Sequence, residues 1–297
     1  MRDLSFRFDD ERGDKEVLHG LTLTIRKGEH VGIRGASGAG KTTLFNLLLG
    51  FYTPTGGEIT IDGEPLTAAN RRRWQNAVGY VSQHVFLLDG TLLENIALGE
   101  EEEKIDRRRA EESLRAARLE DFVQSLSAGI DTPIGEAGNK LSGGQRQRIG
   151  IARALIVEPE FIIADEPISA LDMSIRAQVL NLLRHLQKER GITYLFIAHD
   201  LSVMRYISDR IAVIHKGDIV ELADAEELVT HAIHPYTRSL LSAIPMPSPR
   251  RERQKKLLVY DPAIHDYSAE APQWRELRPR HWVLCSAAEA EAWCREL

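Results

Sequence analysis

The stretch Gly35-Ala36-Ser37-Gly38-Ala39-Gly40-Lys41-Thr42-Thr43 decides the fold of this chain. It matches the pattern G-x-x-x-x-G-K-[ST], and apolar runs before it (30–33) and after it (44–49) predict a strand and a helix. Glycines let the backbone curl so that several N–H groups face one anion, and the positive end of the helix dipole adds to this attraction. The sequence therefore predicts a phosphate-binding loop between a strand and a helix.

Lys41 and Thr42 have separate tasks in a loop of this kind. The Lys41 ammonium group would lie against the β- and γ-phosphates of a nucleotide, and the Thr42 hydroxyl would ligate Mg²⁺. The alternative is a glycine-rich turn that ends in Lys-Thr by chance. The strand and the helix that flank the loop in the required order make this alternative the weaker one.

The charge of the chain argues weakly against nucleic-acid binding. Its 297 residues can bury a sizeable core, and its formal net charge is −6, which leaves no basic excess to neutralise phosphates. Basic runs at 71–73, 107–109 and 250–256 are close to acidic or polar residues. We expect these runs to be solvated faces rather than binding patches.

The two cysteines and the apolar runs argue against a disulfide-rich protein, a four-cysteine metal protein and a membrane-spanning protein. Cys285 and Cys294 are too few for a disulfide framework or a four-cysteine metal site, and they fit a reducing compartment. The first residues are charged and lack the apolar core of a signal peptide, and no apolar run approaches the roughly 18 residues that cross a bilayer. Any role at a membrane would then depend on another chain.

Hydrophobic periodicity predicts the other elements. Alternating or continuous apolar runs predict strands at 4–8, 21–25, 58–61, 77–81, 161–164, 193–198, 211–214 and 219–222. Helical patterns cover 94–126, 146–156 and 175–190, with a charged block at 100–103 as a solvated helix start. A Pro-rich segment at 245–249 precedes a tail of mixed organisation.

Polar residues follow three of the apolar strands at their carboxyl ends. The first strand runs into the phosphate loop, the second into Asp165-Glu166 and the third into His199. Because ligands of open α/β sheets bind at this edge, we expect one site, in which Asp165 holds Mg²⁺ through its water shell and Glu166 polarises an attacking water. The alternative for the two carboxylates is a solvated pair at a strand end.

His199 and Gln83 are the next candidates. A single histidine is commonly structural, but at the end of a buried strand His199 is better explained as a sensor of the γ-phosphate. Gln83 follows the strand at 77–81, and its neutral side chain could reach both the metal and the water. We expect both side chains to act in catalysis.

Leu141-Ser142-Gly143-Gly144-Gln145 is a second glycine-bearing loop at a predicted helix N-terminus. Ser142 could cap the helix, or the loop could complete a nucleotide site elsewhere. The residues alone leave both alternatives open.

This set of motifs resembles the nucleotide-binding domain of ABC transporters over about residues 4–222. Residues 141–145 match the signature loop of that family, in the expected order after Gln83 and before Asp165. The resemblance implies a Mg²⁺-dependent ATPase with an α/β P-loop NTPase (RecA-like) fold: a mixed sheet, an antiparallel β subdomain and an inserted helical subdomain at about 84–158. The nucleotide-binding domain would span 1–231, and a C-terminal extension would span 232–297.

The resemblance also assigns the remaining site residues. Phe8 would stack on adenine, and Asp172 would belong to the D-loop. Two such domains would sandwich two ATP molecules head to tail, and Ser142 and Gly144 would contact the γ-phosphate of ATP held by the second domain. The ATP contacts implied for this second site come from Ser142, Gly143, Gly144 and Gln145. Further partners would be transmembrane transporter subunits at the cytoplasmic face of the membrane, and not nucleic acid.

Two halves of the chain resemble different subfamilies. Residues 87–96 and 134–138 are similar to exporter or flippase cassettes, whereas 161–172, 174–188 and 234–237 are similar to oligopeptide-permease ATP-binding subunits. We therefore expect an engineered chimera with its junction near the signature helix, with a natural importer subunit as the alternative.

Peptide import is the leading function on this interpretation. The alternatives are an exporter or flippase cassette, or a chimera that binds ATP without coupled transport. A non-transport ABC ATPase acting on nucleic acid is a distant alternative, because the chain has one cassette, no sustained heptads and a net negative charge.

Overall fold

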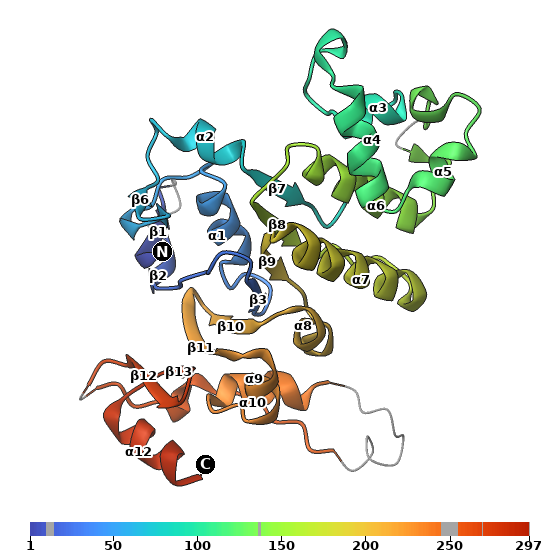
Figure 1. Ribbon diagram of the computed structural model, residues 1–297. Helices are drawn as coiled ribbons and strands as arrows, with labels where there is room; N and C mark the ends of the chain where they lie inside the picture. The colour runs from blue at the N-terminus through green and yellow to red at the C-terminus, as the bar shows by residue number, and fades with distance from the viewer. Residues whose placement is uncertain (10–14, 136–137, 245–254, 269, 297) are drawn as a thin grey trace. The chain divides into compact units, whose positions relative to one another are not determined.

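The computed structural model describes residues 1–9, 15–135, 138–244, 255–268 and 270–296. The chain forms two compact units (Figure 1): unit 1 comprises Met1–Thr24, His30–Pro65 and Ala198–Leu297, and unit 2 comprises Ile25–Glu29 and Leu66–Ile197. The Pro-rich segment at 245–249 lies outside the described residues, as does most of the basic run at 250–256.

A small antiparallel sheet in unit 1 confirms the predicted β subdomain. Its strand order is β2 (Lys15–Leu21), β1 (Arg2–Phe8) and β4 (Gly56–Glu58). The strand predicted at 21–25 is wrong, because β2 ends at Leu21, which pairs with Leu4 near the start of β1. Beyond this pair Asp3 of β1 has a left-handed backbone, with φ 49°, and its N–H group donates to the Thr22 side chain at 2.9 Å, so the regular ladder is interrupted.

A tight turn follows the segment predicted as a strand at 58–61. It joins β5 (Thr60–Ile61) to β6 (Glu64–Pro65), and its two central residues, Asp62 and Gly63, have φ angles of 50° and 88°. A two-residue hairpin turn requires this left-handed backbone, which Asp tolerates and Gly adopts freely.

A mixed run of five strands forms the core of unit 1. The order is β12 (Gln273–Arg278), β13 (His281–Cys285), β11 (Asp218–Asp224), β10 (Arg210–His215) and β3 (His30–Arg34). β10 runs parallel to β3 and antiparallel to β11, so the strands predicted at 211–214 and 219–222 form a hairpin. The helices are α1 (Lys41–Leu48), α8 (Leu201–Ile207), α9 (Ala225–Thr230), α10 (Pro235–Ser242), α12 (Ala287–Glu296) and the 3-10 turn η4 (Pro262–Ile264).

Unit 2 contains three parallel strands, β9 (Thr193–Ile197), β8 (Phe161–Asp165) and β7 (Val78–Val81). Every residue of β9 is buried, as expected of a continuous apolar strand. The helices are α2 (Arg71–Gln75), α3 (Leu92–Ile96), α4 (Arg107–Ala116), α5 (Glu120–Gln124), α6 (Gly143–Leu155), α7 (Met173–Arg190) and the 3-10 turns η1 (Glu102–Lys104) and η2 (Gly129–Asp131).

The helical pattern predicted at 94–126 is divided into several short helices. The expected helix start at 100–103 is wrong, because α4 begins at Arg107, where the side chain of Asp106 accepts a hydrogen bond from the Arg109 N–H group at 3.1 Å. A left-handed backbone at Arg118, with φ 58°, separates α4 from α5. Local capping and this turn thus override the periodic pattern.

The basic run at 107–109 is paired with carboxylates. The Arg107 Nη2 atom lies 2.6 Å from Asp131 Oδ2, and the Arg108 Nη1 atom lies 2.7 Å from Glu112 Oε1.

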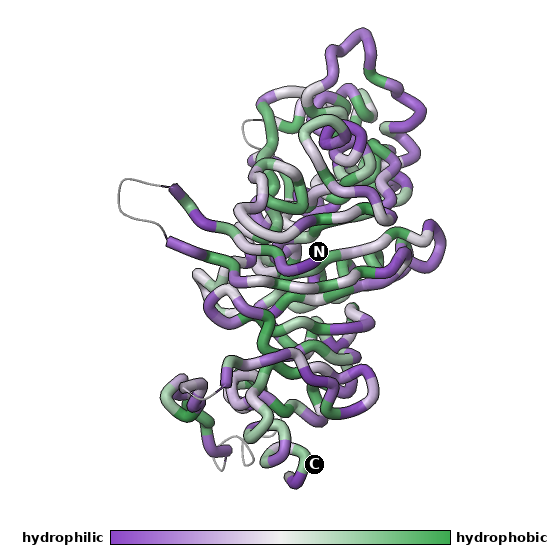
Figure 2. The backbone as a smooth tube through the Cα atoms, turned by 90° about the vertical axis from the view of Figure 1, so that its left-hand side faces the viewer, coloured by the Kyte–Doolittle hydropathy of each residue, from purple (hydrophilic) through white to green (hydrophobic). Residues whose placement is uncertain are grey.

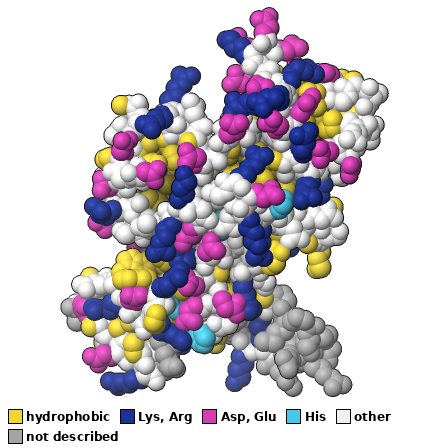
Figure 3. All heavy atoms as spheres, in the orientation of Figure 1, with side chains coloured by type: hydrophobic (Ala, Val, Ile, Leu, Met, Phe, Trp, Pro, Cys, Tyr) yellow, Lys and Arg dark blue, Asp and Glu magenta, His cyan; other side chains and the backbone are white. Residues whose placement is uncertain are grey.

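Positive and negative side chains are mixed over the face shown in Figure 3. In Figure 2 hydrophilic residues predominate in the outer loops and hydrophobic residues lie mainly inside. Within the described residues, every helix is too short or too polar to cross a bilayer.

Candidate functional site

The phosphate loop of unit 1 connects β3 to α1, as the sequence predicts. Gly38 and Gly40 have φ angles of 78° and 99°, and Gly40 caps the N-terminus of α1. A Cβ atom at Gly40 would also lie 2.7 Å from the Leu18 Cδ2 atom. Glycine is therefore required at Gly40 both for its backbone conformation and for the close approach of β2.

The turn between β10 and β11 supports the loop from another side. A Cβ atom at Gly35 would collide with the carbonyl oxygen of Ile214, and the Gly217 N–H group donates to the Ala39 carbonyl at 3.2 Å. The loop backbone is thereby held against the sheet.

Lys41 lies beneath the first residues of the loop. Its side-chain Nζ atom donates to the carbonyl oxygens of Gly35 at 2.9 Å and Ala36 at 2.7 Å, and the residue is only 9% exposed. An ammonium group is buried in this way only where partners compensate for its lost hydration. Lys41 thus lies at the loop for which phosphate binding is predicted, and Thr42 follows it as an exposed residue at the helix start.

Phe8 belongs to an aromatic group in unit 1. Its ring centroid lies 4.9 Å from that of Phe6 and 5.7 Å from that of Tyr52. Tyr52 follows α1 and is 37% exposed, so it is a second candidate for stacking on a base that sequence reasoning missed. The signal was present as an aromatic residue in the polar turn after the predicted helix.

Arg34 connects His199 to the start of the phosphate loop. The Arg34 Nη1 atom is 3.4 Å from the Nδ1 atom of His199 and donates to the Gly35 carbonyl at 3.2 Å. Sequence reasoning missed Arg34, although it is the last residue of β3. The structure thus brings His199 and the start of the loop together within unit 1.

In unit 2, Asp165 ends β8 and interacts with Tyr80 of β7. Burial raises the pKa of Tyr80 to about 12, and the Asp165 charge and a hydrogen bond to that carboxylate contribute in the same direction. The phenol donates this hydrogen bond to the Asp165 carboxylate. Tyr80 is another residue that the sequence did not single out, because a strand tyrosine gives no local sign of its partner.

Glu166 and Gln83 are brought together in unit 2. The Gln83 Nε2 atom donates to Glu166 Oε2 at 3.2 Å and to Ser169 Oγ at 3.3 Å. Glu166 is only 8% exposed and has a φ angle of 47°. A left-handed backbone costs about 1–2 kcal/mol for a residue with a side chain, and such strain concentrates at functional sites.

The signature loop forms a helix cap in unit 2. Ser142 Oγ accepts from the Gln145 N–H group at 3.2 Å, and Gln145 Oε1 accepts from the Ser142 N–H group at 2.8 Å. This capping box realises the first of the two alternatives for the loop. A Cβ atom at Gly144 would lie 2.7 Å from Ile175 Cγ2, and Asp172 caps α7 by accepting from the Ile175 N–H group at 3.0 Å.

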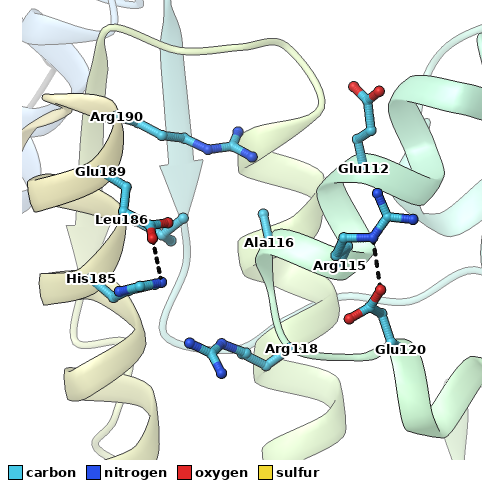
Figure 4. A pocket seen from close by; sticks show the side chains of 9 residues that line it. All are labelled: Glu112, Arg115, Ala116, Arg118, Glu120, His185, Leu186, Glu189 and Arg190. Carbon is cyan, nitrogen blue, oxygen red and sulfur yellow. Dashed lines mark hydrogen bonds and ion pairs between the residues drawn. The ribbon is translucent and has the colours of Figure 1, made fainter.

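A charged pocket of about 390 Å³ also occurs in unit 2 (Figure 4). Its lining combines an Arg115–Glu120 pair at 2.7 Å with a His185–Glu189 pair at 3.0 Å. None of the predicted site residues lines this pocket, and its charges are mixed, so it does not have the character of a nucleotide site.

Comparison with known proteins identifies two regions. Residues 18–169 match the family described as ABC transporter, and residues 220–269 match the family described as oligopeptide/dipeptide transporter, C-terminal region. The "oligopeptide transport ATP-binding protein OppF" of Streptococcus pyogenes serotype M1 is 44% identical over all of this chain and 98% of its own. The OppF of Bacillus subtilis (strain 168) is 43% identical, with 98% and 97% covered.

Two solved structures show the same fold. A bacterial Atm1-family ABC exporter with ATP bound superposes with a TM-score of 0.67 at 35% identity, covering 78% of this chain and 39% of that chain. The ATP-binding cassette MJ0796, in a dimeric structure bound to ADP and Pi, gives a TM-score of 0.63 at 31% identity, with 75% and 97% covered. The predicted P-loop fold is confirmed.

The expected chimera finds no support. Single relatives align over nearly the whole chain, on both sides of the expected junction near the signature helix. The exporter-like residues at 87–96 and 134–138 therefore did not identify a second parent. Because relatives that are 43 and 44% identical cover nearly the whole chain, the protein belongs to the ABC transporter family, among its oligopeptide transport ATP-binding proteins.

Proposed function

We propose that this protein is the subunit that binds and hydrolyses ATP to energise peptide import through separate membrane subunits. The observation that carries the proposal is the phosphate loop with Lys41 buried beneath it, in a chain that is similar along its whole length to oligopeptide transport ATP-binding proteins. An exporter cassette is the weaker alternative, because the exporter structure matches 78% of this chain whereas the peptide transport relative matches all of it.

Each site residue has a task in this proposal. Lys41 and the loop N–H groups bind the phosphates of ATP, and Phe8 stacks on the adenine ring. Glu166 accepts a proton from the attacking water, and Gln83 holds the Glu166 carboxylate in place through its hydrogen bond. His199 contacts the γ-phosphate.

The donor atoms available to a metal are hard oxygens: the Thr42 hydroxyl, the Asp165 carboxylate and the Gln83 amide oxygen. This set suits Mg²⁺, which prefers oxygen ligands and keeps several waters. Among the described residues no group of three or more His, Cys, Asp or Glu side chains could hold a metal alone, which is compatible with a cation shared with phosphate oxygens. Bound Mg²⁺ would neutralise charge on the β- and γ-phosphates.

A second nucleotide-binding domain, either another copy or a different chain, completes the site. Ser142 and Gly143 are exposed at the N-terminus of α6, where backbone N–H groups attract anions. We propose that they, with Gly144 and Gln145, bind ATP held by that second domain, and that Asp172 lies at the same contact. The dimeric structure of the related cassette MJ0796 supports this arrangement.

The proposal places the protein at the cytoplasmic face of the membrane, where ATP is available. The nucleotide-binding domain would comprise 1–231 with a helical subdomain at about 84–158, and the extension 232–297 would be a peptide-transport feature, which the match at 220–269 supports.

Two measurements test the proposal. Light scattering of the Glu166→Gln variant with ATP and without Mg²⁺ should show a dimer, while Lys41→Ala should remain monomeric under the same conditions. Reconstitution with peptide-permease membrane subunits should give ATP-dependent peptide uptake. Persistent monomers would argue against the sandwich, and ATP hydrolysis that is unaffected by peptide and membrane subunits would argue against the transport role.

A further inference from the structure

The phosphate loop has a partner in the C-terminal extension. Tyr236, the second residue of α10, accepts a hydrogen bond on its hydroxyl oxygen from the Ala36 N–H group at 3.1 Å. Both residues lie in unit 1, although 200 positions separate them in the sequence. Of the described side chains, this one reaches from the extension into the loop, and no role assigned above accounts for it.

The peptide group between Gly35 and Ala36 also serves Lys41. Its carbonyl oxygen, on Gly35, accepts from Lys41 Nζ at 2.9 Å, while its N–H group, on Ala36, donates to Tyr236. This peptide group is therefore held on both sides, by the lysine that would contact the phosphates and by a residue of the extension. A displacement of the Tyr236 hydroxyl would change the carbonyl position that orients Lys41.

Tyr236 is itself held rigidly. It is 6% exposed, and its ring centroid lies 4.2 Å from that of His215 and 5.3 Å from that of Tyr260. His215 ends β10, next to Ile214, whose carbonyl lies against Gly35 of the loop. Aromatic packing of this kind fixes the direction of a hydroxyl at small entropic cost, because the ring has few torsions to restrict.

A buried carboxylate fixes the start of α10. Glu221 of β11 is fully buried and accepts from the N–H groups of Ile233 at 2.7 Å and His234 at 3.2 Å. Its Oε1 atom also lies 2.7 Å from the Nε2 atom of His281 in β13. The hydrogen bonds thus run from β13 through Glu221 to α10, and from α10 through Tyr236 to the loop; Figure 1 shows these elements.

We propose that Tyr236 is a positioning residue for the phosphate loop, and that the docked C-terminal extension thereby raises the affinity of this protein for ATP. The inference rests on the proposed function, since ATP is the ligand of the loop. Linkage requires the reverse effect as well: ATP binding must stabilise the docked position of α10.

The test compares two single-hydroxyl deletions in the full chain, Tyr236→Phe and Tyr260→Phe. Both residues belong to the same aromatic group, but only the Tyr236 hydroxyl bonds to the loop in the described structure. We expect Tyr236→Phe to raise the dissociation constant for ATP about 3- to 10-fold, the range for loss of one neutral hydrogen bond, with kcat changed less than KM. Tyr260→Phe should leave the constant within about 2-fold of wild type.

Hydrogen exchange supplies the second readout, and its main comparison, with and without ATP, uses the wild-type protein alone. In the wild-type protein, saturating ATP should slow amide exchange in residues 235–242, and this slowing should be smaller in Tyr236→Phe. Equal ATP affinity of wild type, Tyr236→Phe and Tyr260→Phe overturns the inference, and so does exchange in 235–242 that ATP leaves unchanged. If Tyr236→Phe does not fold, the wild-type exchange decides alone.

The inference and the proposed function fail in different ways. Wild-type protein that does not bind ATP refutes the proposed function, and the inference falls with it. Wild-type protein that binds ATP while showing no effect at Tyr236 refutes the inference and leaves the proposed function intact.

Discussion

The side-chain amide of Gln83 donates a hydrogen bond to the carboxylate of Glu166 at 3.2 Å, across 83 positions of sequence within one compact unit. The contact joins the end of β7 to the end of β8 and gives the buried carboxylate a fixed hydrogen-bond donor. A general base must be held in a defined position relative to its water, and this contact supplies such a constraint for the role proposed above.

Glu166→Gln should bind ATP with nearly the wild-type affinity and hydrolyse it at least about 100-fold more slowly, because the amide cannot accept the proton. Phosphate release and equilibrium ATP binding measure the two quantities. The matched control is Glu160→Gln, which removes a carboxylate that is exposed and paired with Lys27. Equal turnover in wild type and Glu166→Gln would remove Glu166 from its proposed role.

Lys41→Ala should weaken ATP binding by at least about 10-fold, because hydrogen bonds from a charged group contribute about 1.5–3 kcal/mol each. Titration calorimetry of the full chain gives the affinity. Lys27→Ala is the control, since that lysine is 79% exposed and pairs with Glu160. If both variants bind ATP equally well, the loop does not use Lys41 as proposed.

Ser142→Ala should destabilise the protein by about 1 kcal/mol, because the capping box of α6 loses its acceptor. Ser142→Asp keeps a capping oxygen and should keep the thermal midpoint, yet it should weaken ATP-dependent dimerisation, because its negative charge would face a phosphate. Calorimetry and light scattering separate these effects. Unchanged dimerisation of Ser142→Asp would restrict Ser142 to the cap.

Stability should fall on acidification because of His234. Burial lowers the pKa of His234 to about 3 from 6.5, with the nearby His265 and His215 contributing in the same direction. The unfolded chain therefore binds more protons between these values. Above about pH 6.5 His234 is neutral in both states and does not affect stability. Below this pH the free energy of unfolding falls by about 1.4 kcal/mol for each pH unit, until the folded-state pKa is reached.

The His234→Asn variant isolates this effect. Asparagine keeps an oxygen that can accept from the Tyr236 N–H group, as His234 Nδ1 does at 3.1 Å, but it does not titrate. Thermal midpoints measured at pH 7.5 and 5.5 should therefore differ less in His234→Asn than in wild type. An equal drop in both proteins would show that other groups cause the acid sensitivity.

Local patterns predicted the elements whose cause is local. The phosphate loop followed from the spacing of Gly35, Gly40 and Lys41, and β8 and β9 followed from uninterrupted apolar runs. The Gln83 and Glu166 positions followed from strand ends and family motifs. These features depend on neighbours in the sequence, so the sequence displays them.

Contacts between distant segments were not predictable in the same way. Tyr236 meets Ala36 only because α10 is docked in unit 1, and Tyr80 meets Asp165 only because β7 pairs with β8. The hairpin of β12 and β13 was missed although it left a signal: alternating residues on both sides of Pro279-Arg280, where Arg280 has a φ angle of 62°.

The desolvated Glu221 has a consequence for how this polypeptide can be divided. Its carboxylate sits in β11, before residue 231, whereas the three groups that bond to it, on Ile233, His234 and His281, come after that boundary. Excising the tail would remove these hydrogen-bond partners and would also unpair β11 from β13. We therefore expect residues 1–231 and the C-terminal extension to fold as one unit, so a domain exchange between relatives should transfer both together.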